Sequence, residues 1–288
     1  FVCGPRNPED LVSVPGTRWI IASGGEKGTN FYLVDSASRQ WRALPFSVPS
    51  GSGSSQCPQA PVPATLQTHG LHIRSAGRGR AILHVVGHGA REAIEQFDVD
   101  MAGDTPALRW KGCLPMPQGL AANSAVALAD GTVLATVLFL PGKTFAESMS
   151  GKPTGVVLES RPGKPAFEVL KGTELPANNG IDASPDGREI YVVSSGLRTI
   201  VSYRLGNPAT RLGSTRPLPF TPDNVHVGSD GKLYTAGMAA DVPECGGIPG
   251  PQHDLQKLAA CPRGSVAAAI DPRTLRDTIV LETPALRV

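Results

Sequence analysis

The fold is indicated most clearly by residues 179–193, which read Asn-Gly-Ile-Asp-Ala-Ser-Pro-Asp-Gly-Arg-Glu-Ile-Tyr-Val-Val. An Asp-Gly pair, Asp186-Gly187, separates two runs of β-type residues, and a third run follows at 199–203. An Asp-Gly pair between apolar runs is a strong local signal for a β-hairpin. This stretch therefore predicts antiparallel strands joined by tight turns.

Hairpins of this kind recur along the chain. Asp-Gly pairs begin at residues 130, 186 and 230, which are 56 and then 44 residues apart, and weaker turns lie at Pro15-Gly16 and around Gly77-Arg78-Gly79. The four-stranded blades of a β-propeller repeat every ~40–50 residues. A β-sandwich, the second choice, has closer and less regular turns.

The sequence thus predicts an all-β protein, a β-propeller of four-stranded blades that forms one domain over residues 1–288. The 33 Gly and 27 Pro residues agree with many short strands. Short β-type runs lie at 18–22, 31–34, 81–86, 189–193, 199–203 and 232–235, and the one fair helical candidate is 253–260. Five blades are recognisable, near residues 9–46, 68–116, 120–172, 177–220 and 221–282.

Composition argues against several classes of partner. The chain has 27 Lys and Arg against 25 Asp and Glu, and a net charge of +2 is too small to favour a nucleic-acid or anionic-membrane surface. Its best apolar run, 133–140, is far shorter than the ~20 residues of a membrane span. We expect no nucleic-acid partner and no membrane span, and the oligomeric state is not indicated.

Five cysteines bear on the cellular compartment. Cys245 and Cys261 bracket a Gly- and Pro-rich insertion. Cys57 follows a Gly- and Ser-rich loop and Cys113 ends the next blade, so these two could meet, but the sequence leaves the pairing open. Cysteine spacing typical of a zinc site is absent. Disulfides belong to oxidising compartments, so a periplasmic or secreted location is favoured over a cytoplasmic one, for which reduced thiols are the alternative.

The candidate site comes from the register of the repeat. Seven residues before its turn, each blade places a polar side chain at the start of the innermost strand, which in a propeller lines the central channel. A single Asn or Asp there more often satisfies a turn, but the shared offset favours a common site. Oxygen donors of this kind suit a hard cation. The residues are Glu9, His69, Asn123, Asn179 and Asp223, with Asn224 as a further donor.

In these motifs the chain resembles the paraoxonases, which are calcium-dependent six-bladed propellers related to the SMP-30/gluconolactonase and strictosidine-synthase-like groups. The likeness runs from about residue 8 to residue 282 and includes the stretches 8–11, 85–88 and 179–187. Its most specific part is the ordered set of His69-Gly70, His88 and Asp223-Asn224.

The resemblance implies a set of functional residues. It implies that a catalytic Ca²⁺ is bound and that His69 and His88 form a histidine dyad. For the family's second, structural calcium, Asp10 and Leu71 match, but Ser124 stands where an Asp is expected, so we expect a single ion. The implied ligands of the catalytic ion are Glu9, Asn123, Asn179, Asp223 and Asn224.

The resemblance also implies a sixth blade and a disulfide that joins an N-terminal cysteine to one near the C-terminus. Cys3 fits the first partner, and no cysteine follows Cys261. We therefore expect the native chain to continue past Val288 or to receive this blade as a separate segment.

The expected function is that of an arylesterase- or lactonase-like enzyme, the calcium-dependent hydrolysis of a small-molecule carboxylic ester or lactone. Calcium would polarise the carbonyl, His69 would activate the water, and His88 would orient His69 or pass the proton on. The remaining histidines (His72, His84, His226 and His253) are expected to be structural or at the surface. Loops at 47–67, 139–154 and 239–263 are expected to set specificity.

Three alternatives remain open at the level of the sequence. The same metal propeller is compatible with lyase or isomerase chemistry, because a fold does not dictate a reaction. A strictosidine-synthase-like enzyme would use a glutamate and no metal. A non-catalytic binding propeller would need no polar ring in its channel.

Overall fold

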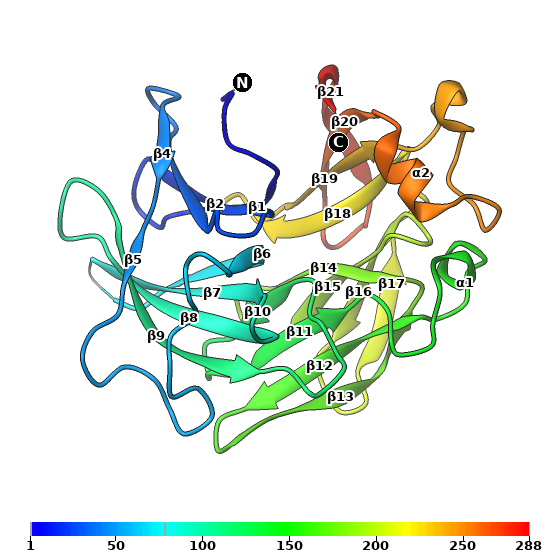
Figure 1. Cartoon of the computed structure of the whole chain (residues 1–288). Coiled ribbons are helices and arrows are strands. Elements are labelled where there is room, and N and C mark those ends of the chain that lie inside the picture. Colours follow the sequence, from blue (N-terminus) through cyan, green and yellow to red (C-terminus); the bar gives the residue numbers. More distant parts are fainter. Residues whose placement is uncertain (1, 78, 288) are drawn as a thin grey trace. The chain divides into compact units, whose positions relative to one another are not determined.

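The computed structural model describes residues 2–77 and 79–287 (Figure 1). In this part of the chain nearly all regular structure is β, in five sheets whose four main strands follow sequence order. The fold class is therefore confirmed as all-β, with five four-stranded blades of a β-propeller. Two of the sequence predictions involve residues outside the described part of the chain. These are Arg78, in the second predicted turn, and Val288, beyond which a further blade was expected.

The first two sheets come from the N-terminal part. Sheet 1 contains β1 (Pro8–Ser13), β2 (Trp19–Gly24), β3 (Phe31–Asp35) and β4 (Trp41–Ala43). Sheet 2 contains β6 (Gln67–Ser75), β7 (Arg80–His88), β8 (Ala93–Asp100) and β9 (Ala107–Pro115), and β5 (Phe46–Ser47) adds to β9 as a parallel fifth strand.

Three more sheets follow. Sheet 3 contains β10 (Ala125–Ala127), β11 (Val133–Val137), β12 (Gly155–Arg161) and β13 (Lys164–Leu175). Sheet 4 contains β14 (Asn178–Ala183), β15 (Glu189–Ser194), β16 (Thr199–Arg204) and β17 (Thr210–Ser214). Sheet 5 contains β18 (Phe220–Val227), β19 (Leu233–Ala239), β20 (Gly264–Ile270) and β21 (Asp277–Arg287).

The repeated Asp-Gly pair forms the same turn each time. The glycine has a positive φ, 91° at Gly131, 67° at Gly187 and 78° at Gly231, which costs glycine little because it has no Cβ. The aspartate Oδ1 accepts a hydrogen bond from the backbone N–H two residues later, at 2.9 to 3.1 Å. This chemistry is why the pair predicted the hairpins.

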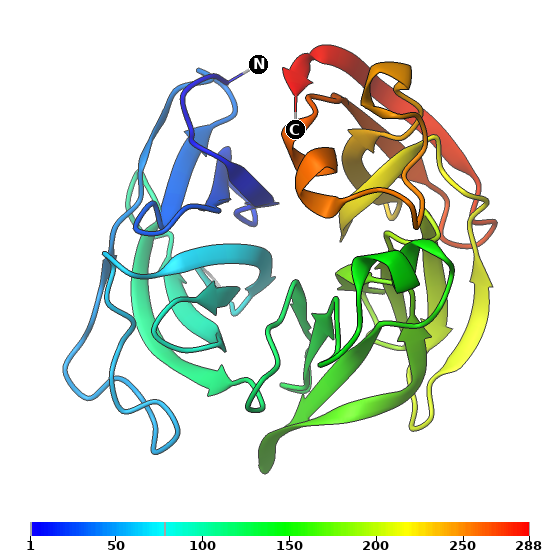
Figure 2. The ribbon, with the colours of Figure 1, turned by 45° about the vertical axis from the view of Figure 1, so that its right-hand side comes forward.

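Short helices lie in the loops (Figure 2). The predicted helix at 253–260 is observed as α2 (Leu255–Ala260), which starts after the N-cap Asp254. A second helix, α1 (Phe145–Met149), and a 3₁₀ turn, η1 (Pro243–Cys245), were not expected. The sequence does contain the signal for α1, a capping box in which Thr144 and Glu147 each bind the other's backbone N–H. No helix in the described part has the length and apolar character that crossing a membrane requires.

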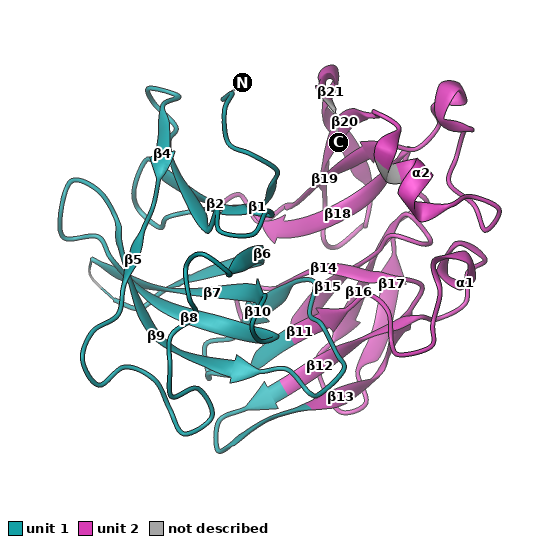
Figure 3. Cartoon of the chain, in the orientation of Figure 1, with its two compact units in different colours: residues 1–134, 160–167 teal, residues 135–159, 168–288 magenta. Residues whose placement is uncertain are grey.

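The chain forms two compact units (Figure 3). Unit 1 comprises residues 1–134 and 160–167, and unit 2 comprises residues 135–159 and 168–288. The core of unit 1 includes Phe31 of β3 packed edge-to-face on Phe97 of β8, with ring centroids 5.4 Å apart. The core of unit 2 includes Tyr191 and Phe220. That the whole chain acts as one propeller domain stays a prediction.

Antiparallel pairing determines which loops lie beside the candidate site. The start of each innermost strand pairs with the end of the second strand. The loop from the second to the third strand therefore leaves the sheet at the same end at which the innermost strand begins. In sheet 2 this loop is the turn 89–92, and in sheet 5 it is the insertion 240–263. Of these, the insertion is held by the Cys245–Cys261 disulfide.

Candidate functional site

The innermost strands of four sheets share one irregularity. Pairing with the second strand is interrupted between Pro8 and Leu11 in β1, and at the corresponding place in β6, β14 and β18. Such a bulge bends the strand and re-aims a side chain, and bulges are common beside active sites. Each interruption holds a predicted site residue and its successor: Glu9-Asp10, His69-Gly70, Asn179-Gly180 and Asp223-Asn224.

Two glycines make close strand contacts possible at these bulges. A Cβ on Gly70 would lie 2.6 Å from the Asn123 carbonyl oxygen and 2.6 Å from Ser124 Cα. A Cβ on Gly180 would lie 2.6 Å from Asn224 Cα. The sequence carried a signal for this feature, because a glycine inside a strand pattern indicates a bulge or a close backbone approach.

In unit 1, His69 lies between two of the predicted calcium ligands. Its Nε2 is 3.3 Å from Glu9 Oε1 and 3.2 Å from Asn123 Nδ2. The ring nitrogen thus faces one acceptor and one donor, so either neutral tautomer finds a partner there. The structure brings together three of the residues that the register singled out, from β1, β6 and the segment before β10.

The environment of His69 favours the neutral imidazole. Burial lowers the pKa of His69 to about 4, the nearby His88 lowers it as well, and Asp10 opposes the shift. A neutral imidazole at pH 7 keeps one nitrogen lone pair, which a general base requires.

His88 packs on His69 and also contacts a residue that the sequence did not single out. The two rings are arranged edge-to-face with centroids 5.3 Å apart and an interplanar angle of 72°. His88 Nδ1 lies 2.5 Å from Glu92 Oε2. No motif marked Glu92, because it sits in a turn outside the repeated strand positions.

In unit 2, the predicted ligands lie on β14 and β18. Asn179 is buried, and its Nδ2 donates to Ser195 Oγ at 3.0 Å. Ser195 in turn donates to the Pro222 carbonyl oxygen at 2.9 Å, next to Asp223. Asn224 uses its backbone oxygen to accept from Thr235 Oγ1 at 2.6 Å. This hydrogen-bond chain links Asn179 to the bulge that holds Asp223.

Two buried oxygens fit the donor set of a hard cation. Asn123 Oδ1 and Asn179 Oδ1 are each buried without a hydrogen-bond partner, which is costly for a carboxamide unless a ligand satisfies it. Residues 2–77 and 79–287 contain no cluster of three or more His, Cys, Asp or Glu suited to a metal. The predicted set has two carboxylates, Glu9 and Asp223, and relies on carboxamides for the rest.

The residues that match the family's second calcium site have other contacts here. Asp10 is buried, and its two oxygens accept hydrogen bonds from the backbone N–H groups of Leu11 and Leu71, both at 2.7 Å. Asp10 therefore ties β1 to β6. Ser124, in the place of the expected Asp, is also buried.

The other four histidines have structural contacts. His72 Nδ1 accepts from Ala127 N–H at 3.2 Å, and His84 is buried beside it with ring centroids 6.3 Å apart. His226 Nδ1 lies 3.8 Å from Asp182 Oδ2, and His253 accepts from Gly250 N–H inside the 240–263 insertion.

Both disulfides that the sequence made possible are present. Cys57 is bonded to Cys113 in unit 1 and Cys245 to Cys261 in unit 2, with Cα atoms 5.7 Å apart in each pair. Cys3 is free and exposed.

Comparison with known proteins identifies the fold. No family model and no curated protein matches the sequence. Among solved structures, a luciferin-regenerating enzyme superimposes with a TM-score of 0.54 at 12% identity over 97% of this chain and 77% of its own. A calcium-binding regucalcin from Agrobacterium tumefaciens strain C58 gives 0.50 at 12% identity, over 97% of this chain and 75% of its own. A protein that carries the provisional name of gluconolactonase superimposes with a TM-score of 0.52 at 16% identity, over 81% of this chain and 72% of its own.

The fold of the chain is similar to that of these three structures. The resemblance drawn from the sequence is thus confirmed at the level of the fold. At 12–16% identity the likeness to SMP-30/gluconolactonase propellers concerns the fold alone, and the narrower likeness to paraoxonases stays a prediction.

Proposed function

We propose that the chain is a calcium-dependent hydrolase of lactones or carboxylic esters, with an arylesterase-like activity included. The observation that carries the proposal is the position of His69 Nε2, in contact with both Glu9 and Asn123. A neutral base beside two oxygen-bearing side chains is an arrangement that suits metal-assisted hydrolysis. The fold shared with a gluconolactonase-named protein supports a lactone as substrate.

The proposed ion is a single catalytic Ca²⁺. When bound, calcium would polarise the substrate carbonyl and stabilise the developing oxyanion. The buried carboxamide oxygens of Asn123 and Asn179 support an oxygen-preferring cation over a transition metal. The residues proposed to hold it are Glu9, Asn123, Asn179, Asp223 and Asn224.

The side chains of unit 1 would handle the proton. His69 is proposed to accept the proton of the attacking water at a ring nitrogen, since its lowered pKa keeps it neutral at pH 7. His88, packed on His69, is proposed to orient that ring or to pass the proton on. Both side chains of the dyad are partly buried, with His69 24% and His88 19% exposed.

Substrate choice and location are proposed from the loops and the disulfides. The 240–263 insertion and the 138–154 loop leave their sheets at the end where the innermost strand starts. The predicted site residues lie at that end, so both loops are placed to contact a substrate. Two disulfides indicate an oxidising compartment, which supports a periplasmic or secreted location.

The proposal is tested by measuring bound calcium together with hydrolysis. Purified protein is assayed on a panel of aliphatic lactones and phenyl esters, before chelation, after chelation, and after return of Ca²⁺ or Mg²⁺. We expect hydrolysis that chelator abolishes and Ca²⁺ restores. Chelator-insensitive hydrolysis would favour a metal-free glutamate enzyme, bound calcium without hydrolysis a lyase or isomerase, and neither property a binding propeller.

A further inference from the structure

Glu92 lies in the turn that connects β7 to β8, four residues after His88. Its Oε2 is 2.5 Å from His88 Nδ1, with the histidine side chain one-fifth exposed and the glutamate about one-third exposed. The contact joins a ring nitrogen to a carboxylate oxygen, and hydrogen bonds to an ionised partner are the shorter and stronger ones in proteins. An ordinary surface ion pair of flexible side chains contributes little to stability and does not fix the position of either side chain. The effect of Glu92 on His88 therefore depends on whether the structure around it holds the glutamate in place.

The backbone of the turn is fixed on two sides. The Glu92 carbonyl oxygen accepts a hydrogen bond from Met116 N–H at 2.9 Å. Gly89, at the start of the turn, has a φ of 129°, and a Cβ on it would lie 2.3 Å from the Thr65 carbonyl oxygen. The turn therefore packs closely against the 48–66 loop, at a point that only glycine tolerates.

An ion pair between the partly exposed Arg91 and the buried Glu95 also holds this turn. Arg91 binds both oxygens of Glu95, at 2.8 and 3.0 Å, and also donates to the Gln59 carbonyl oxygen at 2.7 Å. Glu95 is only 1% exposed, and it accepts a further hydrogen bond from Trp110 Nε1 at 2.7 Å. Its negative charge is thus fully compensated, which is the condition under which a buried carboxylate is tolerated.

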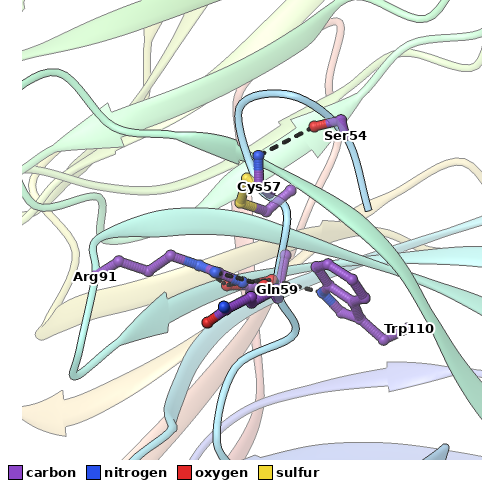
Figure 4. The surroundings of a disulfide bond; sticks show 7 residues. Ser54, Cys57, Gln59, Arg91 and Trp110 are labelled. Carbon is purple, nitrogen blue, oxygen red and sulfur yellow. Dashed lines mark hydrogen bonds and ion pairs between the residues drawn. A yellow bond between two sulfur atoms is a disulfide. The ribbon is translucent and has the colours of Figure 1, made fainter. Parts of the chain in front are cut away.

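The Cys57–Cys113 disulfide secures the loop that this ion pair contacts. Cys57 lies two residues before Gln59 (Figure 4), and its disulfide partner Cys113 lies near the end of β9. The 48–66 loop is thereby bonded covalently to sheet 2 beside the contact between Arg91 and Gln59. Disulfide, ion pair and backbone contacts together hold Glu92 in front of His88.

We propose that Glu92 is a positioning residue for the histidine dyad. By accepting a hydrogen bond from Nδ1–H, Glu92 holds His88 as the Nδ1–H tautomer, so that Nε2 remains a proton acceptor. The same bond fixes the plane of the ring that packs on His69. The inference rests on the proposed function, which gives the dyad its task, but the state of His88 is measurable without any substrate.

The test combines ¹⁵N NMR of the histidine side chains with steady-state kinetics. Two variants change the residue itself: Glu92→Ala removes the carboxylate, and Glu92→Gln keeps an acceptor oxygen and nearly the same side-chain volume. Glu168→Ala is the control for loss of an exposed carboxylate, here on β13. Comparison with His88→Gln assigns the His88 signals, which is practical because the chain has six histidines.

We expect wild type, Glu92→Gln and Glu168→Ala to show the Nδ1–H tautomer at His88 and Glu92→Ala to lose it. We expect kcat of Glu92→Ala to fall ~10–100-fold with KM and calcium content unchanged, as for other side chains that orient a functional histidine. An unchanged tautomer in Glu92→Ala overturns the inference, as does a changed tautomer with wild-type kcat. If wild type hydrolyses nothing, the proposed function fails, and the NMR result alone decides whether Glu92 holds His88.

Discussion

Gly180 of β14 packs against the backbone of Asn224 of β18, so closely that a Cβ on the glycine would lie 2.6 Å from Asn224 Cα. Gly70 makes the equivalent contact with Ser124 in unit 1, also at 2.6 Å. In each case the residue before the glycine, Asn179 or His69, is one of the predicted site residues. The bulges therefore combine two tasks, because they bring neighbouring innermost strands together and they re-aim a polar side chain.

The first prediction concerns this close contact. Gly180→Ala is expected to destabilise the protein by ~1–3 kcal/mol, since the methyl group meets backbone atoms that cannot move aside alone. Gly112→Ala in β9 is the matched control, because nothing lies within 4 Å of its Cβ position, and we expect it to stay within about 0.5 kcal/mol of wild type. Urea unfolding measures both. Equal stability of the two variants would refute the role given to Gly180.

The second prediction concerns calcium. Asp223→Ala is expected to lose bound calcium, to lose hydrolysis, and to lose the stabilisation that calcium confers. An ion present at 100 times its Kd stabilises a folded protein by about 2.7 kcal/mol, so calcium should raise the Tm of wild type and leave that of the variant unchanged. Asp277→Ala, at the exposed start of β21, is the control. Unchanged calcium content in Asp223→Ala would remove this residue from the ligand set.

The third prediction concerns the general base. His69→Gln is expected to retain calcium and to hydrolyse the substrate ~10²–10⁴-fold more slowly, the usual contribution of general-base catalysis. The glutamine keeps polar contacts to Glu9 and Asn123 within reach, which limits the change to loss of the imidazole. Calcium content and kcat are measured on the same preparation, beside His253→Gln in the insertion. A wild-type rate in His69→Gln would exclude His69 from the mechanism.

The fourth prediction concerns stability at acid pH. Burial lowers the pKa of His84 from 6.5 to about 3, and the positive charges of Arg74 and Lys111 lower it as well. Between pH 6.5 and pH 3 the unfolded chain therefore binds a proton at this position that the folded chain does not, so stability falls as the pH falls. At pH 5 this one group accounts for a loss of about 2 kcal/mol relative to pH 7.

Replacing His84 removes that contribution. His84→Gln is expected to show a shallower decline of the free energy of unfolding between pH 7 and pH 5, whatever its stability at pH 7. Urea unfolding at both pH values, on wild type and variant, gives the difference. A decline as steep as in wild type would show that folding does not lower the pKa of His84.

Much of the fold follows from short-range chemistry that a single sequence displays. Asp186-Gly187 and its counterparts predicted the hairpins because the glycine takes a positive φ and the aspartate closes the turn, and both features are observed. The predicted strand at 189–193 is β15, and the insertion that Cys245 and Cys261 bracket is closed by their disulfide. The helix α1 was missed although its capping box is legible at Thr144 and Glu147.

The candidate site was accessible to the sequence only in part. The register placed Glu9, His69 and Asn123 at equivalent positions, because each lies the same number of residues before the turn of its repeat. The register did not reveal the bulges, since an interruption of pairing depends on the partner strand as well as on the strand itself. Gly70 and Gly180 were the local signal for two of them. Glu92 had no signal at all, because its partner His88 lies across a turn whose conformation is set by Met116, Thr65 and Gln59.

The sequence by itself determined the all-β blade, its turns and the polar residue type at the start of each innermost strand, because these depend on residues close together in the chain. Only the tertiary structure decided that His69 Nε2 touches Glu9 and Asn123, that Glu92 binds His88, and that burial lowers the pKa of His69. The physical reason is that a hydrogen bond or a pKa depends on distance and solvent exclusion between side chains as much as 60 residues apart, here His69 and Glu9. Such contacts exist only after separate sheets have packed together.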